Sequence, residues 1–250
     1  MPETCPAALR VGDLHVEVSG TGAPVLLIHG NNGDLHYFDG IVPGLERTFR
    51  VVRMDCRGQG RSARGDGPLT IRRMADDAAD VIRAVQRDGE PFAVVGFSDG
   101  ANVAMALAIH HPELVSALVL NAGNTRRSGM HLVVRAHVRS VDVLLWRRHP
   151  SPSVRSRREL NRLMLDQPGI SRAALAGVDV PTLVVAGTRD IIRRAHTRMI
   201  ARVIPGAQLR IVRRGTHFLM RDLPEIANPM IDGFLRTGAA PMDHARVIER

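Results

Sequence analysis

A serine flanked by two glycines, between an apolar run and an alanine-rich run, constrains the fold of this chain more than any other feature. Residues 92–97 are apolar enough for a buried strand, and residues 101–109 suit a helix that packs on a sheet. A chain that passes from strand to helix within a few residues turns sharply, and Gly96 and Gly100 remove side chains where that turn needs room. The pattern predicts that the hydroxyl of Ser98 lies at the carboxyl edge of a sheet, beneath a helix N-terminus that favours a developing anion.

Length and composition are those of a soluble globular protein. A chain of 250 residues, 44% of them hydrophobic, can bury a substantial core as one large domain. No window approaches the run of about 20 apolar residues that spans a membrane. Residues 1–14 lack the basic region and apolar core of a secretory signal, and two cysteines, Cys5 and Cys56, do not make a disulfide framework. We therefore expect a cytoplasmic protein without a membrane span, in which Cys56 has a structural role.

The net charge of +9 comes from arginine alone, because the chain contains no lysine. Exclusive use of arginine indicates codon bias more than it indicates recognition of a partner. The charged residues are scattered along the chain, and aromatic residues, which could stack on bases, make up only 3% of it. We therefore expect no nucleic-acid partner.

Apolar runs alternate with amphipathic stretches along most of the chain. A hairpin is predicted around Gly12 and Asp13, and continuous apolar runs predict buried strands at residues 24–28, 49–55, 92–97, 115–120, 181–187 and 208–213. Helical patterns separate these strands, for example at residues 71–85 and 193–203. The alternation predicts an α/β fold, with a mostly parallel twisted sheet and helices on both of its faces.

The helix predicted over residues 71–85 carries three carboxylates. Thr70 can cap its N-terminus, and apolar residues follow one helix face. We interpret the opposite face as solvated rather than metal-binding, because hard cations prefer converging ligands in loops; its carboxylates are Asp76, Asp77 and Asp80. The glycines at 58 and 60 lack the third glycine and the following helix of a dinucleotide site. We expect neither a metal nor a cofactor.

The alternation of predicted strands and helices stops within residues 125–175 and then resumes. Short helices are predicted there at residues 132–138, 141–146 and 160–165, with breaks at Pro150, Pro152 and Pro168. We interpret residues 125–175 as a helical lid inserted into a core formed by residues 1–124 and 176–236. A capping box of Asp222 and Glu225 begins the last helix, which ends near Leu235, and residues 237–250 are a tail with little to pack.

Ten arginines lie between residues 126 and 162, within this predicted lid. Arginine binds phosphate and carboxylate groups through a planar fork of donors. One hypothesis is that the lid receives an anionic substrate group, such as the phosphate of a pantetheine thioester, or an acidic carrier protein. The alternative, which we favour, is a solvated helix face in a chain that uses arginine for every basic residue.

Three side chains that can act together in acyl transfer each follow a predicted parallel strand. They are Ser98, Asp190 and His217. A serine nucleophile needs a base within hydrogen-bond reach, an acid that orients the base, and amide donors for the oxyanion. Because parallel strands bring their carboxyl ends to one edge of the sheet, these side chains can converge there.

In its motifs and their order, the chain resembles the α/β-hydrolase superfamily over about residues 14–236. The matching motifs are HGN at 29–31, DCRGQGRS at 55–62, GFSDG at 96–100, GTRD at 187–190 and GTHF at 215–218. The resemblance implies an α/β-hydrolase fold with Ser98 as nucleophile, His217 as general base and Asp190 as its orienting acid. It also implies an oxyanion hole formed by the main-chain amides of Asn31 and Asp99.

Two variants of the family pattern are excluded by the residues. Some members place the acid one strand earlier, but the equivalent loop here offers Asn121 and Asn124 and no carboxylate, which leaves Asp190. Haloalkane dehalogenases bind halide with an asparagine at the position of Asn31, but their nucleophile is an aspartate where this chain has Ser98. The acid at residue 99 is explained by the helix dipole.

We therefore expect a serine hydrolase that cleaves a small ester, thioester or lactone through an acyl-enzyme. The expected partner is a small-molecule acyl substrate. An acyltransferase, a perhydrolase or a hydrolase of carbon–carbon bonds would use the same triad, and the residues do not separate them. A ligand-binding or signalling protein on a hydrolase scaffold, with little turnover, is a further alternative.

Overall fold

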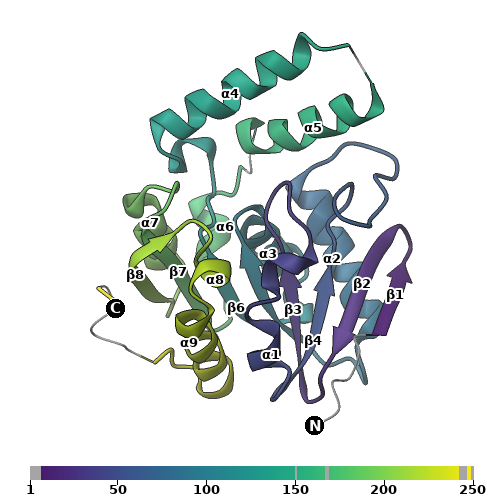
Figure 1. Cartoon of the computed structure of the whole chain (residues 1–250). Helices are drawn as coiled ribbons and strands as arrows, with labels where there is room; N and C mark the ends of the chain where they lie inside the picture. Colours follow the sequence, from purple (N-terminus) through teal and green to yellow (C-terminus); the bar gives the residue numbers. More distant parts are fainter. Residues whose placement is uncertain (1–6, 150, 167–168, 242–246, 249–250) are drawn as a thin grey trace.

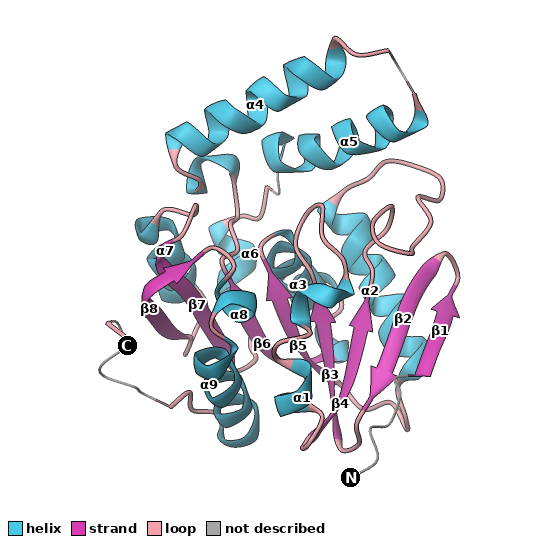
Figure 2. Cartoon of the chain, viewed as in Figure 1, coloured by secondary structure: helices cyan, strands magenta, loops and turns pink. Residues whose placement is uncertain are grey.

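The computed structural model describes residues 7–149, 151–166, 169–241 and 247–248, and its centre is one eight-stranded sheet (Figures 1 and 2). In spatial order the strands are β1 (Ala7–Val11), β2 (Leu14–Ser19), β4 (Phe49–Met54), β3 (Ala23–Ile28), β5 (Phe92–Phe97), β6 (Val115–Asn121), β7 (Thr182–Arg189) and β8 (Gln208–Thr216). The pairs β1–β2 and β2–β4 are antiparallel, and every later pair is parallel. The predicted mostly parallel sheet is confirmed.

Helices cover both faces of the sheet, which explains why its central strands read as continuous apolar runs. Successive residues of a strand point to opposite faces. In β3, Leu26 and Ile28 therefore lie in a core with α2 (Ile71–Val85), α3 (Asp99–His110) and α7 (Arg194–Val203). Val25 and Leu27 lie in a second core with α1 (Val42–Leu45) and α9 (Pro224–Thr237), and all four side chains are completely buried.

Several short helices fill the connections. They are η1 (Leu35–Phe38), η2 (Pro112–Leu114), η3 (Arg127–Gly129), α6 (Arg172–Ala176) and α8 (Leu219–Asp222). The sequence did not predict them, because one turn of helix is too short to establish a hydrophobic period.

Two long helices, α4 (Leu132–Trp146) and α5 (Pro152–Asp166), lie side by side beyond the carboxyl ends of the central strands (Figure 1). The two short helices predicted within residues 132–146 are one continuous helix, because no proline or glycine interrupts that stretch. α5 begins at Pro152 instead of breaking there, since the first residue of a helix needs no amide hydrogen. Pro150 and Pro168 lie outside the described residues.

One of the three carboxylates on α2 is buried, so the prediction of a solvated face is wrong at that residue. Asp77 is 2% exposed and accepts hydrogen bonds from Nε of Arg57 at 2.8 Å and from Nη2 at 2.5 Å. Arg57 lies in the loop after β4, so this bidentate pair ties the loop to α2. The predicted cap of the same helix is confirmed, because Oγ1 of Thr70 accepts from the amide of Arg73 at 3.0 Å.

The capping box predicted before the last helix does not form. α9 begins after Leu223, which makes no side-chain cap. Asp222 instead accepts a hydrogen bond from Oγ1 of Thr216 at 2.6 Å. The carboxylate of Asp222 thus stabilises the loop that follows β8. The spacing of Asp222 and Glu225 in the sequence could not indicate Thr216 as the partner.

The described part of the C-terminal segment packs against the sheet, although the sequence predicted little packing there. Val247 is buried and bridges to Val212 in β8. The amide of Ile248 donates to the carbonyl of Ile211 at 2.9 Å. The rest of the segment beyond residue 241 lies outside the described residues.

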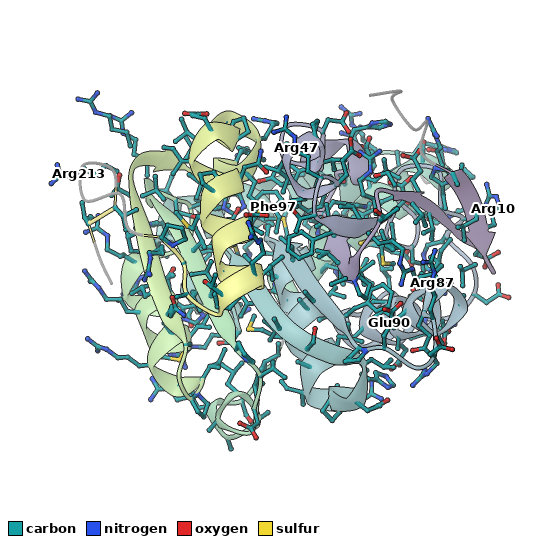
Figure 3. The ribbon with its side chains drawn as sticks, turned by 90° about the horizontal axis from the view of Figure 1, so that it is seen from below. Arg10, Arg47, Arg87, Glu90, Phe97 and Arg213 are labelled. Carbon is teal, nitrogen blue, oxygen red and sulfur yellow. The ribbon has the colours of Figure 1, made fainter. Side chains whose placement is uncertain are left out.

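Many arginine side chains lie at the surface, whereas Arg50, Arg53, Arg57 and Arg210 are buried. Seen from below, Arg10, Arg47, Arg87 and Arg213 lie at or near the rim, whereas Phe97, which is 4% exposed, lies near the middle (Figure 3). Within the described residues, no helix has the length and apolar character needed to cross a bilayer. The cytoplasmic location stays a prediction.

Candidate active site

Ser98 sits on a strained turn between β5 and α3. Its backbone has φ 53° and ψ −117°, in a region that residues other than glycine rarely adopt. A Cβ at Gly96 would overlap the carbonyl oxygen of Gly100, and a Cβ at Gly100 would overlap the carbonyl oxygen of Ile28. Both glycines are therefore required by close backbone approach, as the sequence pattern predicted.

The imidazole of His217 lies between Ser98 and Asp190. Its Nε2 is 3.0 Å from Oγ of Ser98, and its Nδ1 is 2.8 Å from Oδ1 of Asp190. The three residues follow β5, β7 and β8, and His217 and Asp190 are 7% and 9% exposed. With the proton on Nδ1, the ring donates to the carboxylate and leaves Nε2 free to accept from the serine hydroxyl. The structure thus brings the predicted triad residues together at one edge of the sheet.

A backbone amide helps to hold the carboxylate of Asp190. The amide of Ile192 donates to Oδ1 at 2.9 Å, so this oxygen accepts from both Ile192 and His217. Oδ2 is buried and has no partner within the described residues. The oxygen that faces the imidazole is therefore the one that is fixed in position.

The predicted oxyanion residues flank Ser98 from two elements. Asn31 lies in the turn after β3, and Asp99 is the first residue of α3. Within the described residues, the amide of Asn31, in a turn, and the amide of Asp99, at the first position of α3, donate to no backbone carbonyl. Both amides are therefore available as donors, the second with the favourable dipole of α3 behind it.

A partly buried hydrogen-bond network joins these two residues to the inserted helices. Nδ2 of Asn31 donates to Oδ2 of Asp99 at 2.8 Å and to the carbonyl of Leu160 in α5 at 2.7 Å. Nδ2 of Asn102 donates to Oδ1 of Asp99 at 3.0 Å. In α5 the next residue, Asn161, donates to the carbonyl of Val138 in α4 at 3.0 Å. The turn after β3 is thereby connected to α5, and α5 to α4.

The favourable interaction with the helix dipole does not fully explain the carboxylate of Asp99. Burial raises its pKa, and the hydrogen bonds from Asn31 and Asn102 act in the opposite direction. An acidic residue that only interacted with the helix dipole would not need hydrogen bonds from two asparagine side chains. The sequence missed this network because one partner, Leu160, contributes only a backbone carbonyl from a segment far along the chain.

His29 and Cys56 fix the loops beside the site. Nδ1 of His29 lies 2.7 Å from the carbonyl of Gly30, and Nε2 accepts from the amide of Cys56 at 2.9 Å. Burial lowers the pKa of His29, which keeps the ring neutral for these two bonds. Burial also raises the pKa of the Cys56 thiol, so this side chain is not activated as a nucleophile.

Aromatic rings pack against the imidazole. Phe97 lies with its ring centroid 5.0 Å from that of His217, and Tyr37 stacks on Phe97 at 4.0 Å with an angle of 5° between the planes. Phe218 is 41% exposed and lies 5.4 Å from His217. The rings limit the positions open to the imidazole, and this packing could not be predicted from the sequence because the rings come from three separate segments.

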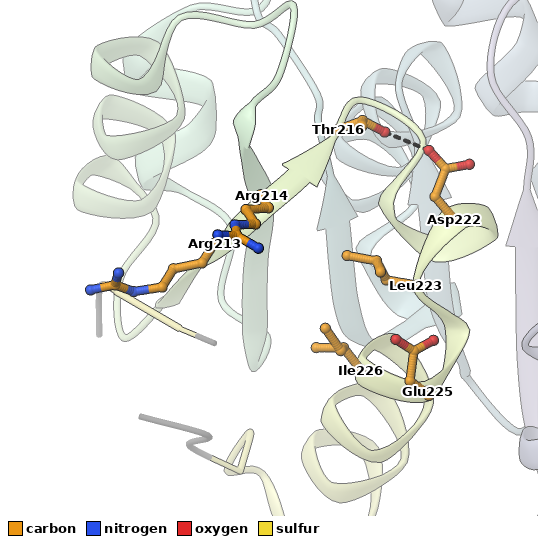
Figure 4. Close-up of a pocket in the computed structure, with 7 residues that line it drawn as sticks. All are labelled: Arg213, Arg214, Thr216, Asp222, Leu223, Glu225 and Ile226. Carbon is orange, nitrogen blue, oxygen red and sulfur yellow. Dashed lines mark hydrogen bonds between the residues drawn. The ribbon is translucent and has the colours of Figure 1, made fainter. Parts of the chain in front are cut away.

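A cavity of about 560 Å³ lies between the end of β8 and the start of α9 (Figure 4). It is lined by Arg213, Arg214, Thr216, Asp222, Leu223, Glu225 and Ile226. The hydrogen bond between Thr216 and Asp222 crosses its upper end. Ser98, Asp190 and His217 are not among the lining residues, so this cavity is separate from the triad.

Known proteins resemble this chain over nearly its whole length. The sequence matches the family described as alpha/beta hydrolase fold over residues 23–140. It is 29% identical over 252 residues to the candidate carbamate hydrolase RutD of Azorhizobium caulinodans, covering 89% of this chain and 94% of that protein. It is 26% identical over 269 residues to the pyrrolizixenacetamide deacetylase of Xenorhabdus hominickii, covering 93% and 99%. A thermophilic esterase from Thermogutta terrifontis superimposes with a TM-score of 0.76 at 25% identity, covering 89% of this chain and 93% of the esterase.

Proposed function

Because this chain belongs to the α/β-hydrolase superfamily, we propose that it is a serine hydrolase that cleaves a small ester, thioester or lactone. The observation that carries the proposal is the position of the His217 imidazole, 3.0 Å from Oγ of Ser98 and 2.8 Å from Oδ1 of Asp190. A nucleophile, a base and an orienting acid in this arrangement suit acyl transfer through a covalent intermediate.

The proposed first step forms an acyl-enzyme. Nε2 of His217 takes the proton of Ser98 as the serine oxygen attacks the carbonyl carbon of the substrate. Asp190 stabilises the resulting imidazolium through Nδ1, and the amides of Asn31 and Asp99 donate to the oxyanion. When the tetrahedral intermediate collapses, the imidazolium gives its proton to the leaving group and the acyl group stays on Ser98.

The second step releases the acyl group to water. His217 takes a proton from a water molecule, which attacks the carbonyl carbon of the acyl-serine. The second tetrahedral intermediate collapses to a carboxylic acid, and the proton returns to the oxygen of Ser98. An alcohol, a peroxide or another acceptor in place of this water would give the acyltransferase or perhydrolase reactions, so the ratio of products formed with and without such acceptors separates these alternatives.

The test of the proposal is the variant Ser98→Ala, assayed on a short p-nitrophenyl ester. We expect turnover to fall by about 10⁶-fold while the far-ultraviolet circular dichroism spectrum is retained. Ser140→Ala is the matched control, because that serine is exposed on α4 and its hydroxyl donates only to the carbonyl of Ala136. Wild-type activity in Ser98→Ala would overturn the proposal, and tight ligand binding without turnover in the wild type would favour a binding protein.

A second candidate activity is cleavage of a carbonyl–nitrogen bond. Two relatives that align over nine-tenths or more of their own lengths carry the names of a carbamate hydrolase and an acetamide deacetylase. The same residues would serve, with His217 protonating a nitrogen leaving group. Matched p-nitrophenyl acetate and p-nitroacetanilide distinguish the two: release of p-nitroaniline requires cleavage of the carbonyl–nitrogen bond and would favour the second candidate, whereas turnover of the ester alone would favour the first.

We also propose that residues 125–175 form a lid over the site, inserted into a core of residues 1–124 and 176–236. The hydrogen bond from Asn31 to the carbonyl of Leu160 supports this division, since it places α5 next to the proposed oxyanion hole. Arg147 and Arg148 are exposed at the C-terminal end of α4, and Nε of Arg158 is bound to Asp142 at 3.2 Å. We therefore assign none of these three arginines to the substrate.

A further inference from the structure

The outer face of α4 exposes a stripe of apolar side chains. We call these residues the outer stripe: Leu132, Val133, Ala136, Val143 and Leu144. Their exposed fractions include 72% for Leu132, 80% for Val133 and 60% for Leu144. Spacings of three, four, seven and eleven residues place them on one side of the helix. The buried residues of α4, Val138 and Leu145, lie on the opposite side.

This arrangement is the reverse of an ordinary surface helix, whose apolar face meets the core and whose outer face is polar. In Figure 1, α4 forms the top of the molecule, and α5 lies between it and the sheet. The outer stripe therefore points away from the rest of the chain. Ser140, which is also exposed, lies among these side chains, so the surface is mostly rather than wholly apolar. Exposed apolar side chains gathered on one helix face mark an interaction site in a folded protein.

The same region is strongly positive. Residues 125–175 contain eleven arginines and three carboxylates, a net charge of +8. Residues 1–124 carry eleven arginines and fifteen carboxylates, and residues 176–250 carry twelve arginines and seven carboxylates, so the excess of arginine is largest in residues 125–175. Arg139 lies beside the outer stripe on α4, Arg147 and Arg148 directly follow the end of the helix, and all three are exposed.

The only tryptophan of the chain completes the surface. Trp146 is the last residue of α4 and is 65% exposed, beside Arg147 and Arg148. Indole rings prefer the boundary between hydrocarbon and water, because the ring is apolar and its N–H still finds a hydrogen-bond partner. A helix with an apolar face, flanking arginines and a terminal tryptophan has the features of a helix that lies in a membrane interface.

From these contacts and charges we propose that the outer face of α4 docks the protein on an anionic lipid bilayer. The outer stripe would enter the interface, Trp146 would lie at its boundary, and Arg139, Arg147 and Arg148 would meet lipid phosphates. The proposal does not depend on the hydrolase activity, because none of these residues contacts the triad.

Other partners fit the surface less well. A nucleic acid would satisfy the arginines but would leave the exposed leucines and valines in water. A second copy of the chain would cover the apolar residues, yet it would set two faces of the same positive charge against each other. An acidic carrier protein would match the charge, and the experiment below separates it from a bilayer.

Trp146 reports binding directly, because the chain has no other tryptophan. Vesicles of equimolar phosphatidylcholine and phosphatidylglycerol, titrated into the full chain, are expected to shift its emission to the blue. Brominated acyl chains in the same vesicles are expected to quench it. Vesicles of phosphatidylcholine alone are expected to bind much more weakly, and salt is expected to weaken binding to the anionic vesicles.

Two variants separate the apolar and electrostatic contributions. Leu132→Ser with Val133→Ser and Leu144→Ser is expected to abolish quenching by brominated lipid. Arg139→Gln with Arg147→Gln and Arg148→Gln is expected to weaken vesicle binding by about fivefold per arginine. The matched control removes three exposed arginines elsewhere, at Arg47, Arg87 and Arg213, and is expected to bind nearly as the wild type does (Figure 3).

Turnover of a soluble ester checks that the variants remain folded, and it is expected to be unchanged in all three. The proposal is overturned if anionic vesicles leave the emission of Trp146 unchanged, or if the matched control loses as much affinity as the α4 arginine variant. It is also overturned if the emission shifts with protein concentration alone, which indicates self-association. A shift produced by soluble polyglutamate but not by vesicles would indicate an acidic protein partner instead.

Discussion

α3 and α4 are both rich in apolar residues, but they use them in opposite ways. α3 follows Ser98 and buries ten of its twelve residues between the sheet and α2. α4 buries two of its fifteen residues and turns its apolar stripe to solvent. The first helix is held on every side by the core, whereas the second is held mainly by α5.

The contrast separates residues that maintain the fold around Ser98 from residues that are exposed on α4. The strained turn at Ser98 persists because α3 and the close approach of Gly100 to Ile28 leave it no alternative. The chemistry proposed for this edge therefore depends on dense packing. In α4, the exposed residues contribute little to folding, so their apolar and charged character indicates a partner outside the chain.

After Ser98→Ala, the largest expected effect comes from the acid at the edge of the sheet that carries Ser98. Asp190→Asn keeps the size of the side chain but disturbs the Nδ1–H tautomer of His217, and we expect turnover to fall by about 10⁴-fold. The matched control is Asp142→Asn, which changes an acid on α4 and is expected to leave turnover within about twofold of wild type. Equal losses in the two variants would contradict the contrast between the regions.

A matched pair of leucines tests the packing difference itself. Leu107 on α3 is completely buried, and Leu144 on α4 is 60% exposed. We expect Leu107→Ala to lower the free energy of unfolding by about 2–5 kcal/mol, because it leaves a cavity. Leu144→Ala should change it by less than about 0.5 kcal/mol. Urea denaturation measures both, and a large loss at Leu144 would show that α4 is part of the cooperative core.

The Asn31 side chain links the two regions, so its removal should have an intermediate effect. Asn31→Ala deletes the donor shared by Asp99 and the carbonyl of Leu160, which loosens the turn that carries the proposed oxyanion amide. We expect kcat to fall by roughly tenfold, about 1.4 kcal/mol. Ser140→Ala is again the control, because its hydroxyl donates to the carbonyl of Ala136, outside this network. An unchanged kcat in Asn31→Ala would show that the Asn31 side chain does not position the turn that carries the proposed oxyanion amide.

The smallest expected effect concerns pH and the start of the insertion. Nε2 of His196 accepts from the amide of Thr125 at 3.0 Å, and burial, with Arg126 and Arg193 nearby, lowers the pKa of His196 from 6.5 to about 4. The folded state thus favours the neutral ring, so its contribution to stability is present above about pH 6.5 and is lost as the pH falls through about 4. Chemical denaturation across this range should show the loss, and His196→Gln should flatten it. An identical pH profile in the variant would refute this assignment.

Local patterns in the sequence predicted the parts of the fold that depend on local chemistry. Continuous apolar runs predicted the buried strands, and the two glycines around Ser98 predicted the sharp turn between β5 and α3. The convergence of Ser98, Asp190 and His217 followed from the rule that parallel strands end at one edge. The roles of these residues stay proposals, although their geometry suits them.

Long-range pairing accounts for what the sequence did not predict. Asp77 was assigned to solvent because its partner, Arg57, lies in another loop. The capping box failed because Asp222 bonds to Thr216 across a turn. The network of Asn31 and Asp99 ends on a backbone carbonyl in α5. Every residue has a backbone carbonyl, so the residue types of the sequence cannot indicate which one accepts this hydrogen bond.

The central claim is that Ser98 is a nucleophile activated by His217. The most direct measurement is labelling with a fluorophosphonate, followed by mass spectrometry of the digested protein. The serine oxygen displaces fluoride and forms a bond to phosphorus, so we predict one adduct per chain, located on Ser98 and nearly absent in His217→Ala. No adduct on the folded wild type, or an adduct on another residue, would contradict the account.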